Sequence, residues 1–253
     1  MAVFVDHPLA VLIVMFVVLV AAVSFGAYVL RRRIAVTDDV REDYKVVQAA
    51  TLTLLALLIG FTLSMAVGRY DQRKNLEENE ANAIGTEFVR ADLADPAMGY
   101  AIKGALIRYT RLRVADFLTR DPQQLELIGR QTSDTQAELW RLATEVAKDK
   151  ANPIGALVVS GMNDTLNSQD YSEAARINRV PIGAWALLFL IAIAGCIVQG
   201  YGAQGRLSAG LYVTLLPFTV SLSLALIADI DSPRGGIIHV QPQNLMRLEQ
   251  AIH

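Results

Sequence analysis

Cysteine and histidine are almost absent from this chain of 253 residues. The single cysteine, Cys196, excludes an intramolecular disulfide and any metal site that needs more than one thiolate. The three histidines, His7, His239 and His253, form no HxH or HxxxH pair, so we expect no metal site. Phosphate loops, GxSxG elbows and dinucleotide fingerprints are missing too. The sequence therefore predicts neither a cofactor nor an enzyme.

Neither basic nor acidic side chains are in large excess. The chain has 23 basic and 25 acidic side chains, and the net charge of −2 argues against a nucleic-acid partner. Only 19% of the residues are charged and 53% are hydrophobic, whereas about 25% and about 45–50% are typical of soluble domains. This abundance of aliphatic residues excludes a disordered chain and favours a protein that contacts lipid.

Charged residues are missing altogether from four long stretches, residues 8–30, 46–68, 180–201 and 207–228. A helix needs about 20 apolar residues to cross the hydrocarbon core of a bilayer, and each stretch is long enough. Only helices and closed barrels satisfy their backbone in lipid, and the alternation typical of barrel strands is absent. We therefore predict an all-α integral membrane protein with four transmembrane helices in the cell membrane, where lipids are its partners.

The charge-free stretches also divide the chain. Residues 1–68 hold the first helix pair, residues 69–179 an extramembrane insert, residues 180–228 the second pair, and residues 229–253 a short C-terminal tail. The insert has 15 basic and 17 acidic residues, and no proline separates it from the second helix before Pro96. We expect the second helix to continue outside the membrane as far as about Leu93.

Helical spacing recurs throughout the insert. Ile102, Leu106 and Tyr109 follow each other at steps of four and three, which indicates an amphipathic helix. Asp95-Pro96, Asp121-Pro122 and Asn152-Pro153 predict helix starts, because Asp or Asn caps free amides and proline fits the first turn. The insert is thus predicted to hold about four helices.

The orientation of the chain stays open at this stage. Arg31, Arg32 and Arg33 follow the first helix, and the positive-inside rule places their loop in the cytoplasm and the insert outside. Basic residues at the ends of the insert, such as Arg69 and Arg179, weaken that assignment.

One face of the second helix mixes small, hydroxylated and bulky side chains. It consists of Thr53, Leu57, Gly60, Phe61 and Ser64, which recur at steps of three and four. A ring of such helices lines a water-filled path in which apolar rings form a constriction. In the alternative interpretation, Gly60, Ser64 and Gly68 form a small-xxx-small seam between two packed helices.

Acidic residues follow this helix. Glu77, Glu78 and Glu80 are candidates for a pore mouth, because rings of carboxylates attract cations. Alternatively they belong to a solvated helix face, with Arg73 and Lys74 as partners four residues away. Farther on, Asp229 and Asp231 either bind a cation or an arginine, or shape a turn that includes Pro233.

Three segments resemble bestrophins, and they occur in the same order. Residues 58–70 resemble the second bestrophin helix, with a Gly-Phe pair at Gly60 and an Arg-aromatic pair nine residues later. Residues 105–109 are similar to a Leu-Ile-Arg-Tyr stretch of the cytosolic region, and residues 229–235 resemble the acidic turn after the last helix. Residues 78–85 are similar to a bacterial bestrophin-like family of unknown function.

The resemblance implies a pentameric ion channel whose second helices line the pore and whose insert and termini are cytoplasmic, in conflict with the basic loop. The bestrophin neck has three bulky apolar residues, and the matching positions are Thr53, Leu57 and Phe61, of which Thr53 departs from the pattern. The acidic run of the animal calcium clasp has no counterpart, since no carboxylate follows Gly235 before Glu249.

The sequence therefore favours an oligomeric bestrophin-like channel for small inorganic ions, with Leu57 and Phe61 as the constriction. The alternative is a non-conducting membrane scaffold or sensor whose helical insert binds a partner.

Overall fold

The computed structural model describes residues 5–33, 38–149, 153–202 and 210–253. Every regular element in this part of the chain is a helix, which confirms the predicted all-α class. Asn152 and the first three residues of the fourth charge-free stretch, 207–209, lie outside the described residues.

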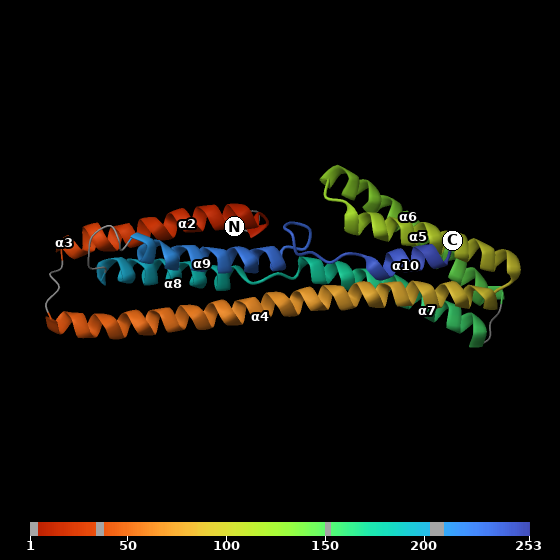
Figure 1. The fold of residues 1–253 in the computed structure, drawn as a ribbon. Coiled ribbons are helices and arrows are strands. Elements are labelled where there is room, and N and C mark those ends of the chain that lie inside the picture. The colour runs from red at the N-terminus through yellow and green to blue at the C-terminus, as the bar shows by residue number, and fades with distance from the viewer. Residues whose placement is uncertain (1–4, 34–37, 150–152, 203–209) are drawn as a thin grey trace. The chain divides into compact units, whose positions relative to one another are not determined.

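Two compact units make up the chain. One comprises Met1–Arg69 and Arg179–His239, and the other Tyr70–Asn178 and Val240–His253. The 229–253 tail is therefore shared between the two units. Figure 1 shows the helices, which are α2 (Pro8–Phe25), the π-helix η1 (Gly26–Leu30), α3 (Arg31–Arg33), α4 (Asp38–Arg90), the short 3₁₀ helix η2 (Ala91–Leu93), α5 (Pro96–Leu118), α6 (Pro122–Asp149), α7 (Pro153–Ile177), α8 (Ile182–Gly202), α9 (Gly210–Asp231) and α10 (Gln243–Ala251).

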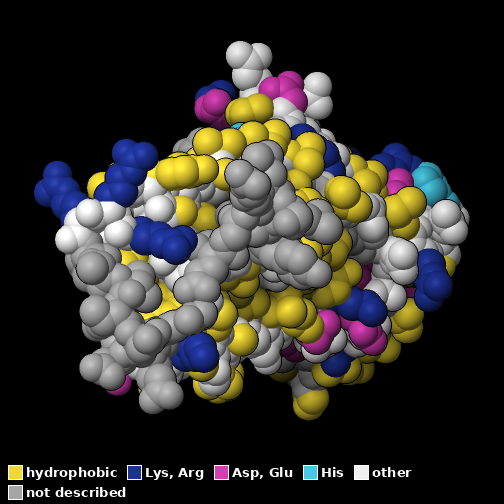
Figure 2. Space-filling model, turned by 60° about the vertical axis from the view of Figure 1, so that its left-hand side comes forward, with side chains coloured by type: hydrophobic (Ala, Val, Ile, Leu, Met, Phe, Trp, Pro, Cys, Tyr) yellow, Lys and Arg dark blue, Asp and Glu magenta, His cyan; other side chains and the backbone are white. Residues whose placement is uncertain are grey.

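The first unit contains the membrane-type helices. Four helical segments of the described chain are long and apolar enough to span a bilayer, in agreement with the prediction. Many of their large apolar side chains are exposed in the single chain, among them Leu9, Ile13, Leu190 and Phe218. Figure 2 likewise shows hydrophobic side chains spread over the face that it displays. Such an apolar surface is typical of a protein solvated by lipid or covered by other subunits.

Helices α2 and η1 approach α8 very closely. A Cβ atom on Gly200 would lie 1.9 Å from the carbonyl oxygen of Val23, and one on Gly26 would lie 2.1 Å from that of Ile197. Small residues that let two backbones meet are the usual basis of helix packing in membranes, where no hydrophobic effect drives association. Helix α2 also contacts α9, so α2, α8 and α9 form one bundle.

The second unit has a soluble-type core. Its fully buried side chains include Ile84 of α4, Leu106 and Tyr109 of α5, Leu139 of α6 and Met162 of α7. The predicted apolar stripe of Ile102, Leu106 and Tyr109 thus faces the core. The predicted helix starts are confirmed where they are described, since the Asp95 carboxylate accepts from the amide of Ala97, and the Asp121 carboxylate from that of Gln123.

Helix α4 belongs to both units. It runs without a break for 53 residues from Asp38 to Arg90, and η2 extends it to Leu93. The predicted continuation of the second helix as far as about Leu93 is therefore confirmed, and the helix also begins earlier than predicted.

The crossing at Gly200 yields a test. We expect Gly200→Ala to lower the thermal unfolding midpoint of the purified protein in detergent, because the new methyl group must displace backbone. Overpacking of this kind costs about 1–3 kcal/mol. Gly183→Ala on the same helix is the matched control, since a Cβ there meets nothing within 4 Å. Equal midpoints for the two variants would contradict the close packing.

Candidate functional site: the exposed face of helix α4

The face of α4 that the sequence singles out is exposed in the single chain. Thr53, Leu57, Gly60, Phe61 and Ser64 are all exposed. The side chain of Leu57 is 52% exposed and that of Phe61 67%. All five residues recur at helical steps of three and four, so they form one continuous stripe.

The other side of the same helix is used for packing. Leu55, Thr62 and Ala66 are buried. Near the start of the helix, the Tyr44 hydroxyl donates to the carbonyl oxygen of Val198 at 2.7 Å. These contacts within the first unit fix the rotation of α4 about its axis, so the stripe faces away from the bundle.

Gly60 and Gly68 do not form a seam with any other described part of the chain. A Cβ atom added to Gly60 or Gly68 would meet nothing within 4 Å. A small-xxx-small contact at these glycines therefore requires a second copy of the chain or another protein.

Two of the three acidic pore-mouth candidates are buried in the second unit. The carboxylate of Glu77 accepts from the backbone amides of Asn244 at 2.9 Å and Leu245 at 3.0 Å, and from the Asn244 side chain at 2.8 Å. It therefore caps the N-terminus of α10, where free amides and the helix dipole favour a negative charge.

Glu80 is buried as well. Its carboxylate accepts from the buried guanidinium of Arg113, which also lies 3.5 Å from Asp116 and 3.6 Å from Glu173. A buried arginine requires such neighbours, because an isolated charge loses its hydration. Of the three candidates only Glu78 is exposed, and we retain it alone for a pore mouth.

A third buried carboxylate, Glu87, faces α7. Neither of its oxygens has a hydrogen-bond partner among the described residues. Gly161 makes room for it, since a Cβ there would lie 2.0 Å from Glu87 Oε2. Burial raises the pKa of Glu87 to about 8; the positive charge of Arg90 opposes this rise and the carboxylate of Asp164 adds to it. Glu87 is therefore largely neutral at pH 7, which the sequence does not indicate.

The loop after α9 is held by carboxylates of the first unit. The Asp229 carboxylate accepts from the amides of Ile237 at 2.7 Å and Ile238 at 2.9 Å. Gly236 adopts a φ of +72° beside it, a conformation that favours glycine. Asp231 accepts from the amide of Val180 at 3.0 Å. The Asp231 carboxylate also lies 3.7 Å from Arg179 Nε. Of the alternatives that the sequence left open, the structure therefore shows the turn for Asp229 and an arginine partner for Asp231.

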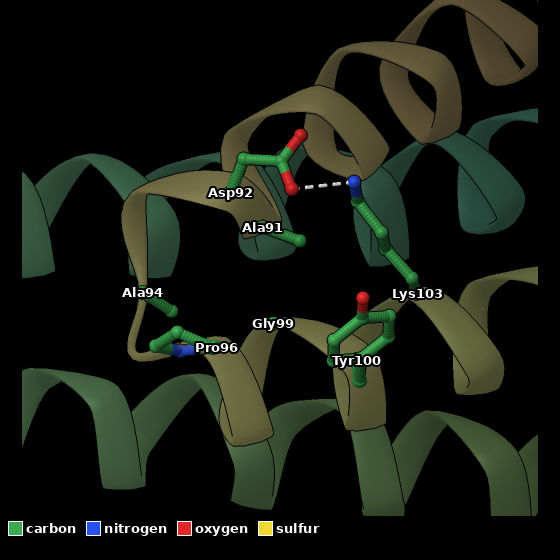
Figure 3. Close-up of a pocket in the computed structure, with 7 residues that line it drawn as sticks. All are labelled: Ala91, Asp92, Ala94, Pro96, Gly99, Tyr100 and Lys103. Atoms are coloured by element: carbon green, nitrogen blue, oxygen red, sulfur yellow. Dashed lines mark hydrogen bonds and ion pairs between the residues drawn. The ribbon is translucent and has the colours of Figure 1, made fainter.

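A small pocket lies at the bend between η2 and α5. It has a volume of about 240 Å³ and is lined by Ala91, Asp92, Ala94, Pro96, Gly99, Tyr100 and Lys103. Figure 3 shows the ion pair between Lys103 Nζ and Asp92 Oδ1, at 2.5 Å, on one side of it. None of its lining residues belongs to the exposed stripe, and its two charges neutralise each other.

Among the described residues, no three His, Cys, Asp or Glu side chains are arranged to hold a metal ion.

Glu87 generates a prediction about pH. Because its pKa in the folded protein, about 8, lies above the ordinary value of 4.5, the folded state holds the proton more tightly than the unfolded state. The free energy of unfolding must then fall as the pH rises from about 4.5 to about 8. We expect Glu87→Gln to remove this fall and to stabilise the protein by roughly 3–5 kcal/mol at about pH 9.

The measurement is thermal unfolding in detergent at several pH values. Glu78→Gln is the matched control, since Glu78 is exposed on the same helix. If the unfolding midpoints of the native protein and the Glu87→Gln variant change with pH in parallel, the buried carboxyl is not protonated in the folded protein.

Comparison with solved structures gives the same fold. A crystal structure of a bacterial bestrophin homologue from Klebsiella pneumoniae is 13% identical, with a TM-score of 0.68 and coverage of 96% of each chain. Two single-residue variants of a bestrophin homologue from this organism are also 13% identical. One has a TM-score of 0.72 and covers 96% of each chain; the other has a TM-score of 0.70 and covers 95% of this chain and 97% of its own.

No curated protein matches the chain significantly. The family described as the bestrophin-like domain matches residues 10–245, which is most of the sequence. With its helical fold, its four candidate membrane-spanning helices and this match, the chain belongs to the bestrophin-like family.

Proposed function

We propose that several copies of this protein assemble in the cell membrane into an ion channel, with α4 of each copy lining the pore. The observation that supports this most is the exposure of the whole stripe of α4, from Thr53 to Ser64, while the opposite side of the helix is buried. Because the stripe is exposed on the single chain, the proposal requires other copies around a common axis to enclose a path.

Leu57 and Phe61 are the proposed constriction. Both are bulky, apolar and exposed, and they are one helical turn apart. In a ring of copies, two such layers form a narrow apolar passage, from which water withdraws and in which ions lose hydration. Thr53, one turn from Leu57, adds a hydroxyl ring instead of a third apolar ring.

Family membership supports the same function, because bestrophins are ion channels. The resemblance also implies that the assembly is a pentamer. The substrate class is small inorganic ions, and Glu78 is the acidic residue left to act at the pore mouth.

The second candidate function, a non-conducting scaffold or sensor, is based on one observation. The second unit exposes large apolar and aromatic side chains, among them Tyr100 at 80%, Tyr171 at 62% and Ile177 at 81%. Exposed apolar surface of this kind is typical of binding surfaces. Contacts between copies explain it equally well.

The decisive test is electrical. We expect purified protein to conduct ions in planar bilayers, and we expect Leu57→Ala and Phe61→Ala to raise the single-channel conductance by about twofold or more, because smaller apolar rings hold water more easily. Leu190→Ala is the matched control, since Leu190 is exposed on α8 rather than on the stripe. Silent bilayers from well-folded protein, or equal effects of all three substitutions, would overturn the proposal.

A further inference from the structure

Three consecutive arginines end the first helical segment of the chain. Arg31–Arg33 form α3, and all three are exposed. They follow directly on the charge-free residues 8–30, and Figure 1 shows α3 continuing from α2 at one end of the first unit. A helix as long as this charge-free stretch measures about 35 Å, slightly more than the hydrocarbon core of a bilayer. When α2 spans the membrane, the three arginines therefore lie at the level of the lipid headgroups.

The side chains just before the arginines are suited to the same depth. Phe25, Tyr28 and Val29 are 48%, 67% and 41% exposed. Exposed apolar side chains of a membrane-spanning helix are solvated by lipid tails. Tyrosine is enriched where the tails meet the headgroups, because its ring is apolar and its hydroxyl is polar. Within about two helical turns, this segment therefore changes from a surface for lipid tails to a surface for headgroups.

Close packing fixes the position of α3 within the first unit. Helix η1, which immediately precedes α3, contacts both α2 and α8. At Gly26 of η1, an added Cβ atom would lie 2.1 Å from the carbonyl oxygen of Ile197 and 2.9 Å from the backbone nitrogen of Tyr201. A packed end of the helix bundle therefore presents the three arginines.

The other described charges at this end of the bundle balance each other. Tyr44 belongs to this end, because its hydroxyl donates to the carbonyl oxygen of Val198, close to the end of α8. Its neighbours Asp43 and Lys45 are both exposed and have opposite charges. The net positive charge of the described side chains at this end therefore comes from Arg31–Arg33.

A basic residue at the opposite end of α2 has a different environment. Asp6 precedes α2, and its Oδ1 lies 2.6 Å from Nη2 of Arg179. The Oδ2 atom of Asp231 lies 3.7 Å from Nε of the same guanidinium, and the side chain of Arg179 is only 21% exposed. The arginine at this end is therefore paired within the chain, whereas the basic residues at the other end face outward.

We propose that Arg31–Arg33 form a binding site for the phosphate groups of anionic phospholipids. A guanidinium donates two parallel hydrogen bonds to phosphate oxygens, and its aliphatic stem can lie along the apolar surface of the helix. Each basic residue near an anionic membrane surface contributes about fivefold in affinity. The positive-inside rule alone explains the position of these arginines but requires no preference among headgroups. The inference goes beyond the proposed function, because it does not depend on whether the protein conducts ions.

The native protein allows a first test. The purified protein in detergent is titrated with phosphatidylglycerol or phosphatidylcholine, and its thermal unfolding midpoint is measured. We expect phosphatidylglycerol to raise the midpoint at a concentration about tenfold lower, because only this lipid has a net negative charge. Raising the salt from about 0.1 M to about 0.5 M should remove most of this difference, since salt screens exposed charges. Equal effects of the two lipids, or loss of the phosphatidylglycerol effect when inorganic phosphate is added at the same concentration, would overturn the site.

Substitution assigns the preference to α3. In the variant that combines Arg31→Gln, Arg32→Gln and Arg33→Gln, we expect the half-effective concentration of phosphatidylglycerol to rise about tenfold or more, and in the milder Arg32→Gln variant about fivefold. The matched control combines Arg120→Gln, Arg130→Gln and Arg141→Gln, which removes the same charge from exposed positions of the second unit. An unchanged half-effective concentration in the α3 variants, or an equal rise in the control, would overturn the site.

Discussion

Helix α4 imposes the central constraint on this protein, because one of its sides is used within the chain and the other is not. In the first unit its inner side has Leu55 and Ala66 buried, and its Tyr44 is hydrogen-bonded to α8. In the second unit its inner side provides Ile84 to the core and Glu80 to Arg113. Within each unit, these contacts determine which residues of α4 remain exposed.

The buried carboxylates contribute to this constraint. Glu77 binds the N-terminus of α10 and Glu80 binds Arg113, so each ties α4 to another helix of the second unit. Removing one partner of a buried ion pair typically costs about 3–5 kcal/mol. Glu87 differs, since it has no hydrogen-bond partner among the described residues and remains buried by staying protonated. Glu77 and Glu80 therefore stabilise the packing of α4 within the second unit, whereas the buried carboxyl of Glu87 lowers the stability as the pH rises.

Much of the fold follows from the sequence. Charge-free stretches give the membrane-type helices, and Asp-Pro pairs give the starts of α5 and α6. The stripe at Leu57 and Phe61 follows from spacing alone. The sequence does not predict which glutamates are buried, because Glu77, Glu78 and Glu80 are chemically alike. Their burial depends on neighbours in three dimensions, Asn244 for Glu77 and Arg113 for Glu80. The close crossing at Gly200 likewise depends on the position of Val23, far away in the sequence.

Imaging of the purified protein in lipid nanodiscs, at a resolution that shows side chains, tests the central claim most directly. Several copies of α4 should surround one axis, five if the assembly follows the bestrophin pattern, with Leu57 and Phe61 of each copy facing a water-filled path. A monomer or dimer, or an assembly in which these two side chains contact acyl chains, would contradict the claim.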